Sequence, residues 1–281
     1  MMPDRLDPSA YRDIVRRAIT EDIGPGDVTT LAIVSATVRA HATLLAKSTC
    51  VLAGLDIARE VFEQVDGALE FRAFKRDGDL CHSGESLARI EGRAAAILAA
   101  ERTALNFVQH LSGIATLTRR FVDATGGALT VLDTRKTIPT LRALAKYAVR
   151  CGGATNHRVG LYDGVLIKDN HIRLAGGVAE AVRRVRATGS ALPIEIEAQS
   201  MDDVDDALAV GVEVIMLDNL DDNTMREAIR RIGGRARVEI SGGVTIDHIR
   251  LLAMMGADTV SVGALTHSAM AADISVEIEI G

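Results

Sequence analysis

The chain contains 281 residues, of which 48% are hydrophobic and 25% are charged, and its formal net charge is −6 at pH 7. This composition is typical of a globular protein with one large domain or two modest ones. The net negative charge excludes a general attraction to nucleic acid or to anionic membranes, so any basic patch has to be local.

The amino-terminal segment and the cysteines bear on the cellular compartment. Residues 1–20 contain seven Asp and Arg side chains, which leave no room for the apolar core of a signal peptide. No uncharged apolar run reaches the roughly 18 residues that a membrane-spanning helix needs. Cys50, Cys81 and Cys151 are an odd number without CxxC spacing, as expected for reduced structural thiols. We therefore expect a cytoplasmic protein.

The first part of the chain predicts an α+β domain. Strand-like runs separated by turns containing Gly and Asp are HATLLAK, ALEFRAFK and ESLARIEG. Apolar residues then recur at helical spacing over about 30 residues, with a break expected near Gly113. The tail AADISVEIEIG is strand-like and is expected to pack back on this domain. We predict an open-sandwich domain of residues 1–112, completed by about 268–281.

From about residue 130 the pattern becomes regular. Six short β-rich runs are LTVLDT, GVLIKD, PIEIEA, VEVIMLD, ARVEIS and DTVSVG. Between them lie helical segments, namely LRALAKYAVR, VAEAVRRVRA, MDDVDDALAV, NTMREAIRRI and IDHIRLLAMM. This alternation predicts parallel strands joined by crossover helices. Because a complete (β/α) barrel has eight units, we predict an incomplete, six-stranded parallel α/β barrel for residues 113–267.

Polar or glycine residues follow each of the six predicted strands. In parallel α/β folds the working groups gather at the carboxyl ends of the strands. In chain order these ends carry Arg135 and Lys136, Lys168, Glu197, Asp218, Ser241 with Gly242 and Gly243, and Gly263, while His157 and Arg158 precede the second strand. Each residue alone is equally compatible with a solvated loop or a simple turn, but their recurrence at consecutive strand ends predicts one site.

The charges of this set indicate the ligand. The cations Arg135, Lys136, Arg158 and Lys168 would repel one another strongly without an anion, which favours a polyanionic substrate. Two carboxylates, Glu197 and Asp218, beside bound phosphates are typical of a Mg²⁺ site. The turns SGG and VGALTHS offer backbone N–H groups to a phosphate. We expect a site for one multiply phosphorylated substrate and one small carboxylate-bearing partner, assembled around a divalent cation.

A long central motif carries a family resemblance. LDTRKTIPTLRALAKYAVRCGGATNHRVGLYDGVLIKDNH closely resembles the signature of the quinolinate phosphoribosyltransferases. The resemblance continues in EDIGPGDVTT, ERTALNFVQHLSGIAT, IEIEA, IMLDN, SGG and VGALTHS, and so covers nearly the whole chain. It implies the reaction of quinolinate with phosphoribosyl pyrophosphate to nicotinate mononucleotide, CO₂ and pyrophosphate, in NAD biosynthesis and with Mg²⁺. It also implies a homodimer in which Arg102 of one subunit reaches the active site of the other, although its place at the edge of an apolar helical stripe equally fits a snorkelling arginine.

The resemblance also assigns roles to individual residues. Arg135, Arg158 and the partner subunit's Arg102 would bind the two carboxylates of quinolinate, and His157 and Lys168 would line the same pocket. Lys136 and Lys168 would face the pyrophosphate, and Glu197 and Asp218 would hold the ribose hydroxyls and the metal, directly or through pyrophosphate and water. The 5′-phosphate would lie against Ser241, Gly242, Gly243, Gly263 and His267. The full substrate-binding set also includes Thr134, Val262 and Ala264, and catalysis is assigned to Lys136, Lys168, Glu197 and Asp218.

Three other interpretations remain open from the residues. A related phosphoribosyltransferase could use another acceptor, such as nicotinate, or belong to a molybdenum-associated branch of the family; the full set of three arginines favours a dicarboxylate. A Schiff-base aldolase would use Lys168 as its nucleophile. A sugar-phosphate-binding regulatory protein would keep the phosphate turns, but would gain nothing from Glu197 and Asp218.

Overall fold

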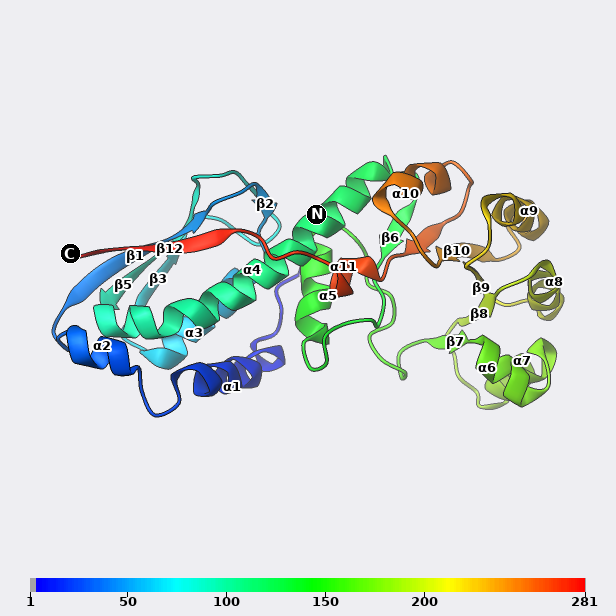
Figure 1. Cartoon of the computed structure of the whole chain (residues 1–281). Helices are drawn as coiled ribbons and strands as arrows, with labels where there is room; N and C mark the ends of the chain where they lie inside the picture. The colour runs from blue at the N-terminus through cyan, green and yellow to red at the C-terminus, as the bar shows by residue number, and fades with distance from the viewer. Residues whose placement is uncertain (1–3, 281) are drawn as a thin grey trace. The chain divides into compact units, whose positions relative to one another are not determined.

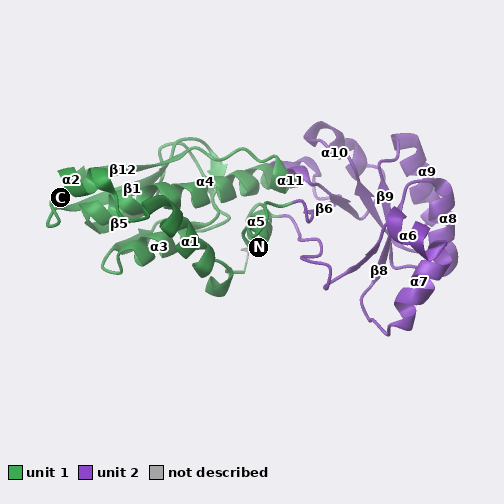
Figure 2. Cartoon of the chain, turned by 60° about the horizontal axis from the view of Figure 1, so that its bottom comes forward, with its two compact units in different colours: residues 1–119, 137–153, 265–281 green, residues 120–136, 154–264 purple. Residues whose placement is uncertain are grey.

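The structure is a computed structural model, and it describes residues 4–280. The chain divides into two compact units, shown in Figure 2. Unit 1 comprises residues 1–119, 137–153 and 265–281, and unit 2 comprises 120–136 and 154–264. These units differ from the predicted domains chiefly in residues 137–153, which belong to unit 1.

Unit 1 is built on a four-stranded antiparallel sheet with the order β12-β1-β5-β3. Its strands are β1 (Arg39–Ala46), β3 (Glu70–Ala73), β5 (Ser86–Arg93) and β12 (Ile274–Ile280), and a separate pair is β2 (Cys50–Val51) with β4 (Leu80–Cys81). In β1 every second residue is buried, from Ala40 to Ala46, so one face of the strand meets the core. The carboxyl-terminal β12 pairs along β1, from Ala40 opposite Ile280 to Ala46 opposite Ile274.

Helices cover this sheet and complete unit 1. They are η1 (Pro8–Ala10), α1 (Arg12–Ile23), α2 (Val28–Ile33), α3 (Leu55–Val65), α4 (Ala94–Ala124, whose last five residues are assigned to unit 2), α5 (Arg142–Cys151) and α11 (Ala264–His267, whose first residue is assigned to unit 2). Figure 1 shows α4 running along the strands. Leu105 and Val108 of α4 join Leu44 of β1 and Leu87 of β5 in one buried apolar cluster. The three cysteines are buried and unpaired.

The break expected in the long helix near Gly113 was wrong, because α4 is continuous over 31 residues. The glycine has a packing reason instead. A Cβ at position 113 would overlap the carbonyl oxygen of Met270, so only glycine lets this backbone pass so close.

Helix α5 was predicted as a crossover helix of the barrel, yet it groups with unit 1. The Tyr147 hydroxyl donates a hydrogen bond to Asp77 at 2.8 Å. Arg119 donates to the carbonyl of Gly152, directly after α5, at 3.0 Å. Seven of its ten residues are buried, which explains the mostly apolar segment around Leu144 to Val149.

Unit 2 contains the six predicted strands, all parallel, in the order β6-β11-β10-β9-β8-β7. They are β6 (Thr130–Leu132), β7 (Val165–Ile167), β8 (Ile194–Ala198), β9 (Val214–Asp218), β10 (Arg237–Ser241) and β11 (Thr259–Ser261). In residues 4–280 the edge strands β6 and β7 form no ladder with each other. Thr155, in the segment that precedes β7, forms a single parallel bridge with Leu132 of β6. The predicted fold class, an incomplete six-stranded α/β barrel after an α+β domain, is confirmed.

The crossover helices of unit 2 are α6 (Asp169–Ala175), α7 (Val178–Ala187), α8 (Met201–Val210), α9 (Asp222–Ile232) and α10 (Ile246–Ala253). Figure 2 shows α7 to α10 as a layer outside the strands. The residue before the first turn caps three of them through its side chain: Ser200 caps α8, Asp221 caps α9 and Thr245 caps α10. None of the helices in residues 4–280 combines the length and the apolarity that crossing a membrane would require.

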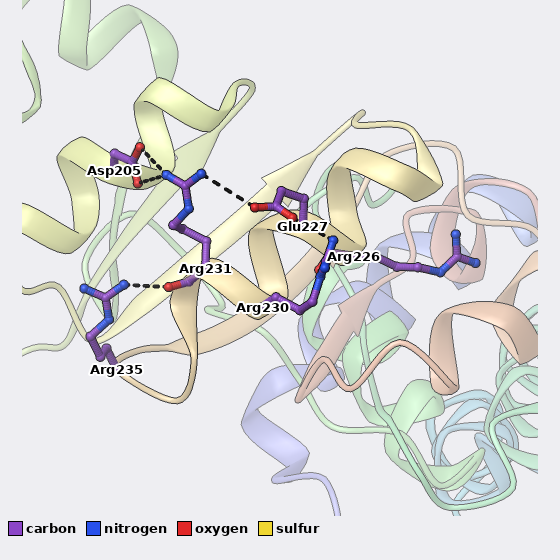
Figure 3. A network of polar contacts seen from close by, with 6 residues as sticks. All are labelled: Asp205, Arg226, Glu227, Arg230, Arg231 and Arg235. Carbon is purple, nitrogen blue, oxygen red and sulfur yellow. Dashed lines mark hydrogen bonds and ion pairs between the residues drawn. The ribbon is translucent and has the colours of Figure 1, made fainter.

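Neighbouring helices of unit 2 are also joined at the surface. Figure 3 shows Arg231 of α9 donating to both carboxylate oxygens of Asp205 in α8, at 2.9 and 2.7 Å. Glu227 lies 2.6 Å from Arg230 and 3.6 Å from Arg231. Such exposed pairs each stabilise a fold by about 0–1 kcal/mol, so the network orients the helices and the buried strands supply the stability.

Candidate active site

A cavity of about 380 Å³ opens at the carboxyl ends of the strands of unit 2. Residues from all six strand ends line it, which follows from the parallel sheet order because such ends meet at one rim. The lining comprises Asp133, Thr134, Arg135, Lys136, His157, Arg158, Leu166, Lys168, Glu197, Met216, Asp218, Asn219, Glu239, Ser241, Gly242, Gly243 and Ser261.

A larger cavity, about 660 Å³, opens at the amino ends of the same strands. Its rim consists largely of strand-start residues such as Thr130, Pro193, Val214 and Thr259. His157, Arg158 and Arg237 reach this cavity, but Arg135, Lys136 and Lys168 are not in its lining, and active sites of α/β barrels lie at the carboxyl end. We therefore assign the candidate active site to the smaller cavity.

Eleven of the predicted substrate-binding residues line this cavity: Thr134, Arg135, Lys136, His157, Arg158, Lys168, Glu197, Asp218, Ser241, Gly242 and Gly243. Val262, Gly263 and Ala264 follow β11 in unit 2 but are not among the lining residues. Arg102 and His267 belong to unit 1, and their predicted roles stay predictions.

The cationic side of the cavity is anchored by Asp133, directly after β6. This side chain is fully buried and accepts hydrogen bonds from the His157 backbone N–H at 2.8 Å and the Asn156 amide at 2.7 Å. Asp133 thereby ties the Arg135 turn to the loop that carries Arg158. Burial, and next the nearby Arg135 charge, lower the pKa of Arg158 from its ordinary value. Two guanidinium groups are thus held close together, an arrangement that an anionic ligand would stabilise.

The acidic residues of the cavity are already hydrogen-bonded. Lys168 forms an ion pair with Glu197, which also accepts from the Gln199 amide at 3.3 Å. The Asn219 amide donates to Asp218 at 2.7 Å. Asn219 has a φ of 55°, and its backbone N–H donates to the Ser241 carbonyl. These contacts hold both carboxylates at the ends of their strands.

The turn after β10 requires glycine. Gly242 and Gly243 have φ values of 95° and 58°, in the region that favours glycine. A Cβ at Gly242 would also clash with the Asn219 side chain. Successive residues of this kind turn backbone N–H groups toward one side, which suits an anion.

Three ionisable side chains meet inside the barrel, next to the wall of the cavity that carries Arg135 and Arg158 (the cationic wall). They are His157, Glu195 and Glu239. His157 Nε2 lies 3.1 Å from Glu195 Oε2 and 3.6 Å from Glu239 Oε2. Glu195 is 8% exposed and Glu239 3%, and one oxygen atom of each has no hydrogen-bond partner. Burial, and next the Glu195 charge, raise the pKa of Glu239 to about 7.

Sequence reasoning missed several lining residues, notably Asp133, Asn219, Glu239 and Ser261. A signal for Glu239 was present, because it is a charged residue in the middle of the apolar run ARVEIS. The contact of His157 with Glu195 and Glu239 joins residues 38 and 82 positions apart, counted from residue 157 to 195 and to 239. Periodicity within one strand does not predict such a contact.

Comparisons with known proteins extend over both units. Residues 27–112 match the family model described as quinolinate phosphoribosyl transferase, N-terminal domain, and residues 114–277 match the model of the C-terminal domain. The chain is 43% identical over 276 residues to a nicotinate-nucleotide pyrophosphorylase (carboxylating) of Mycobacterium leprae (strain TN), covering 96% of this chain and 97% of the relative. It is 40% identical over 271 residues to a probable enzyme of the same name from Bacillus subtilis (strain 168), covering 96% and 93%.

Solved structures agree with these sequence matches. The crystal structure of NadC from Streptococcus pyogenes superposes with a TM-score of 0.95 at 40% identity, over 99% of each chain. A nicotinate-nucleotide pyrophosphorylase from Francisella tularensis also superposes with a TM-score of 0.95, at 35% identity and again over 99% of each chain. The chain belongs to the quinolinate phosphoribosyltransferase family.

Proposed function

We propose that this protein transfers the phosphoribosyl group of phosphoribosyl pyrophosphate to quinolinate with decarboxylation, yielding nicotinate mononucleotide, CO₂ and pyrophosphate. Relatives at about 40% identity carry the names of this enzyme. One observation carries the proposal: Arg135, Lys136 and Arg158 share a single strand-end cavity with Glu197 and Asp218.

Quinolinate binding follows from the cationic wall. Quinolinate is a dianion at neutral pH, and the planar guanidinium groups of Arg135 and Arg158 suit its two carboxylates. Its charge would offset both the burial and the Arg135 repulsion that lower the Arg158 pKa. Nicotinate, with one carboxylate, would leave part of this repulsion in place, so we expect the protein to prefer the dicarboxylate.

The phosphoribosyl step follows from the acidic residues. Loss of pyrophosphate leaves positive charge on the ribosyl carbon, which Glu197 and Asp218 are suited to stabilise. Lys136 and Lys168 would neutralise the departing pyrophosphate. The pyridine nitrogen of quinolinate then bonds to this carbon. When the adjacent carboxylate leaves as CO₂, its bonding electron pair stays on ring carbon 2, where the neighbouring positive nitrogen stabilises it. That carbon then takes a proton from water to give nicotinate mononucleotide. Holding the two substrates in this orientation supplies much of the rate enhancement.

We further propose that Mg²⁺ takes part. The donor set fits a hard cation, because Glu197 and Asp218 offer carboxylate oxygens in the cavity where a pyrophosphate would lie. When bound, the ion would supply positive charge to the phosphate oxygens. The 5′-phosphate would lie against the Gly242–Gly243 turn, with Gly263 of the same unit completing its site.

A homodimer in the cytoplasm is also part of the proposal. Arg102 is exposed on α4 in the single chain, as suits a side chain that binds its ligand in a partner subunit. Its role is then to complete the carboxylate-binding set formed by Arg135 and Arg158.

A direct assay tests the function. Purified protein is supplied with phosphoribosyl pyrophosphate, Mg²⁺ and either quinolinate or nicotinate, and CO₂ and pyrophosphate are measured together. We expect equal amounts of both products with quinolinate and little pyrophosphate with nicotinate. Pyrophosphate release with nicotinate alone would reassign the acceptor, and absence of both products with quinolinate would refute the proposal.

A further inference from the structure

The loop that carries Arg158 is held by side chains, not by secondary structure. Four consecutive backbone N–H groups, of residues 157 to 160, each donate to a side-chain acceptor. Asp133 accepts from His157, and Asp163 accepts from Val159 and Gly160 at 2.7 and 2.8 Å. The remaining N–H, of Arg158, donates to Nδ1 of the His157 ring at 2.8 Å.

That hydrogen bond determines the protonation of His157. A neutral imidazole has one acceptor and one donor nitrogen, and Nδ1 is the acceptor here. The proton is therefore on Nε2, which faces Glu195 Oε2 at 3.1 Å and Glu239 Oε2 at 3.6 Å. Both ring nitrogens thus face protein groups: Nδ1 faces the Arg158 backbone N–H in the loop, and Nε2 faces the two glutamates inside the barrel.

We propose that Glu195 and Glu239 are positioning residues of the active site, and that they act through the His157 ring to hold the backbone of Arg158. In this arrangement His157 acts on the substrate through Arg158. This inference rests on the proposed function, and it adds a positioning role to the place in the pocket lining that the family resemblance assigns to His157.

Arg158 is placed by the same loop on both sides. Its guanidinium donates to the Gly164 carbonyl at 3.1 Å, and a Cβ at Gly164 would lie only 3.2 Å from the Arg158 Cβ. The side chain therefore lies flat against Gly164 once its backbone is fixed. A ring that turned away from Glu195 would free the Arg158 N–H and loosen this geometry.

The charges of the two acids agree with a positioning role. The raised pKa of Glu239 keeps this carboxyl group protonated up to about neutral pH. Glu195 also raises the Arg158 pKa, opposing the effect of Arg135. The nearer acceptor for Nε2–H is Glu195 Oε2, at 3.1 Å.

The same three residues have the composition of a metal site, since their ligand atoms lie within 4.8 Å of one another. A hydrogen bond from Nε2–H explains the 3.1 Å separation without an ion. Metal bound at this place would occupy Nε2 and would remove the donor on which the proposal depends.

The test uses two substitutions at one position, His157→Asn and His157→Leu. The Asn oxygen takes the place of Nδ1 and can still accept from the Arg158 N–H, whereas Leu cannot. We expect His157→Leu to raise KM for quinolinate on the order of tenfold, and His157→Asn to raise it several times less. KM for phosphoribosyl pyrophosphate should change little in either variant. Equal losses in both variants would overturn the proposal.

A second pair of variants tests whether Glu195 positions the His157 ring. Glu195→Leu should raise KM for quinolinate selectively, because the ring loses its acceptor. Glu213→Leu is the matched control, since Glu213 accepts a hydrogen bond from the N–H of Ile194, the β8 residue next to Glu195, and has no contact with the His157 ring among those described. Thermal melting of each variant shows whether a loss reflects unfolding. A Glu195→Leu variant that stays folded and retains the wild-type KM for quinolinate would contradict the proposal.

A measurement on the wild-type protein separates this inference from the proposed function. Nitrogen-15 histidine NMR reports which ring nitrogen carries the proton, and the His157 signals are identified by their loss in His157→Asn. A neutral ring with its proton on Nε2 supports the inference even if quinolinate is not turned over. A doubly protonated ring, or one metal ion per chain by elemental analysis that is lost in Glu239→Leu, would overturn it.

Discussion

Two carboxyl groups, one in each unit, have raised pKa values for the same main reason and yet have opposite surroundings. Burial is the largest cause at both Asp77 in unit 1 and Glu239 in unit 2. Asp77 accepts three hydrogen bonds, from the Gly54 and Leu55 N–H groups at 2.9 and 3.0 Å and from Tyr147 at 2.8 Å. Glu239 faces another carboxyl group and has an oxygen atom without a partner.

The difference separates structural from functional use of a buried charge. Asp77 satisfies the first N–H groups at the start of α3 and links that helix to α5, so its desolvation is offset by the contacts it makes. Glu239 is incompletely satisfied beneath a ligand cavity, and buried polar groups of that kind cluster at functional sites. Removal of Asp77 should therefore lower the free energy of unfolding, and changes around Glu239 should alter activity.

The largest expected effect is a loss of activity on substitution of a residue in the unit 2 cavity. Arg135→Ala should lower kcat/KM for quinolinate about 1000-fold, on the order of 4 kcal/mol, because a carboxylate in a dry pocket loses its charged partner. The free energy of unfolding should hardly change, since the variant also relieves repulsion of Arg158. Steady-state kinetics and denaturant titration measure the two quantities.

Arg230→Ala provides the matched control for this change. Within the described part of the chain, Arg230 contacts Glu227 and the Arg226 carbonyl, both on the exposed surface of α9. Its loss should leave both quantities close to wild type. If calorimetric titration finds the same quinolinate affinity in Arg135→Ala as in wild type, the carboxylate-binding role is wrong.

The second largest expected effect is a loss of stability on substitution of Asp77 in unit 1. Asp77→Ala should lower the free energy of unfolding by about 3 kcal/mol, because two helix N–H groups and the Tyr147 hydroxyl lose their acceptor together. Tyr147→Phe removes one of these bonds and should cost about 1 kcal/mol. Chemical denaturation measures the free energy of unfolding of both variants. If Asp77→Ala lowers it by less than Tyr147→Phe does, then the hydrogen bonds that Asp77 accepts do not stabilise the fold together.

A smaller effect is expected at the acidic side of the cavity. Asp218→Asn should lower kcat about 30-fold, on the order of 2 kcal/mol, with little change in quinolinate affinity. The Asn219 amide that now donates to Asp218 can donate to the new amide oxygen, so the strand end should keep its shape. Single-turnover kinetics separate the chemical step from binding, and an equal loss in both would count against a role in the transition state.

The parts of this molecule that were predictable from sequence are those governed by local periodicity. The runs around Val131, Ile196 and Ile240 are apolar because these strands are buried, and parallel pairing then gathers their ends at one rim. Arg135, Lys168 and Asp218 consequently share one cavity.

Other features depend on contacts between distant segments. Gly113 resembles a helix break in the sequence, and only the carbonyl of Met270, far along the chain, gives it a different meaning. The helical pattern of α5 is the same whether it covers a barrel or joins unit 1, and its contact with Asp77 decides. His157 lines the cavity as predicted, but the contacts of its ring with Glu195 and Glu239 depend on two distant strands.

The smallest effect concerns Glu239 and pH. The folded protein holds this proton up to about pH 7, whereas an ordinary Glu loses it near 4.5. Between these values the unfolded state binds fewer protons, so the free energy of unfolding falls as pH rises, and above the upper value the loss is complete. Glu239→Gln cannot ionise and should lack this slope. Denaturation of both proteins should therefore show wild type losing about 1 kcal/mol more than the variant between about pH 5 and pH 6. Parallel curves would mean that the pKa of Glu239 is not raised, and that its burial is offset in the folded protein by contacts other than those described.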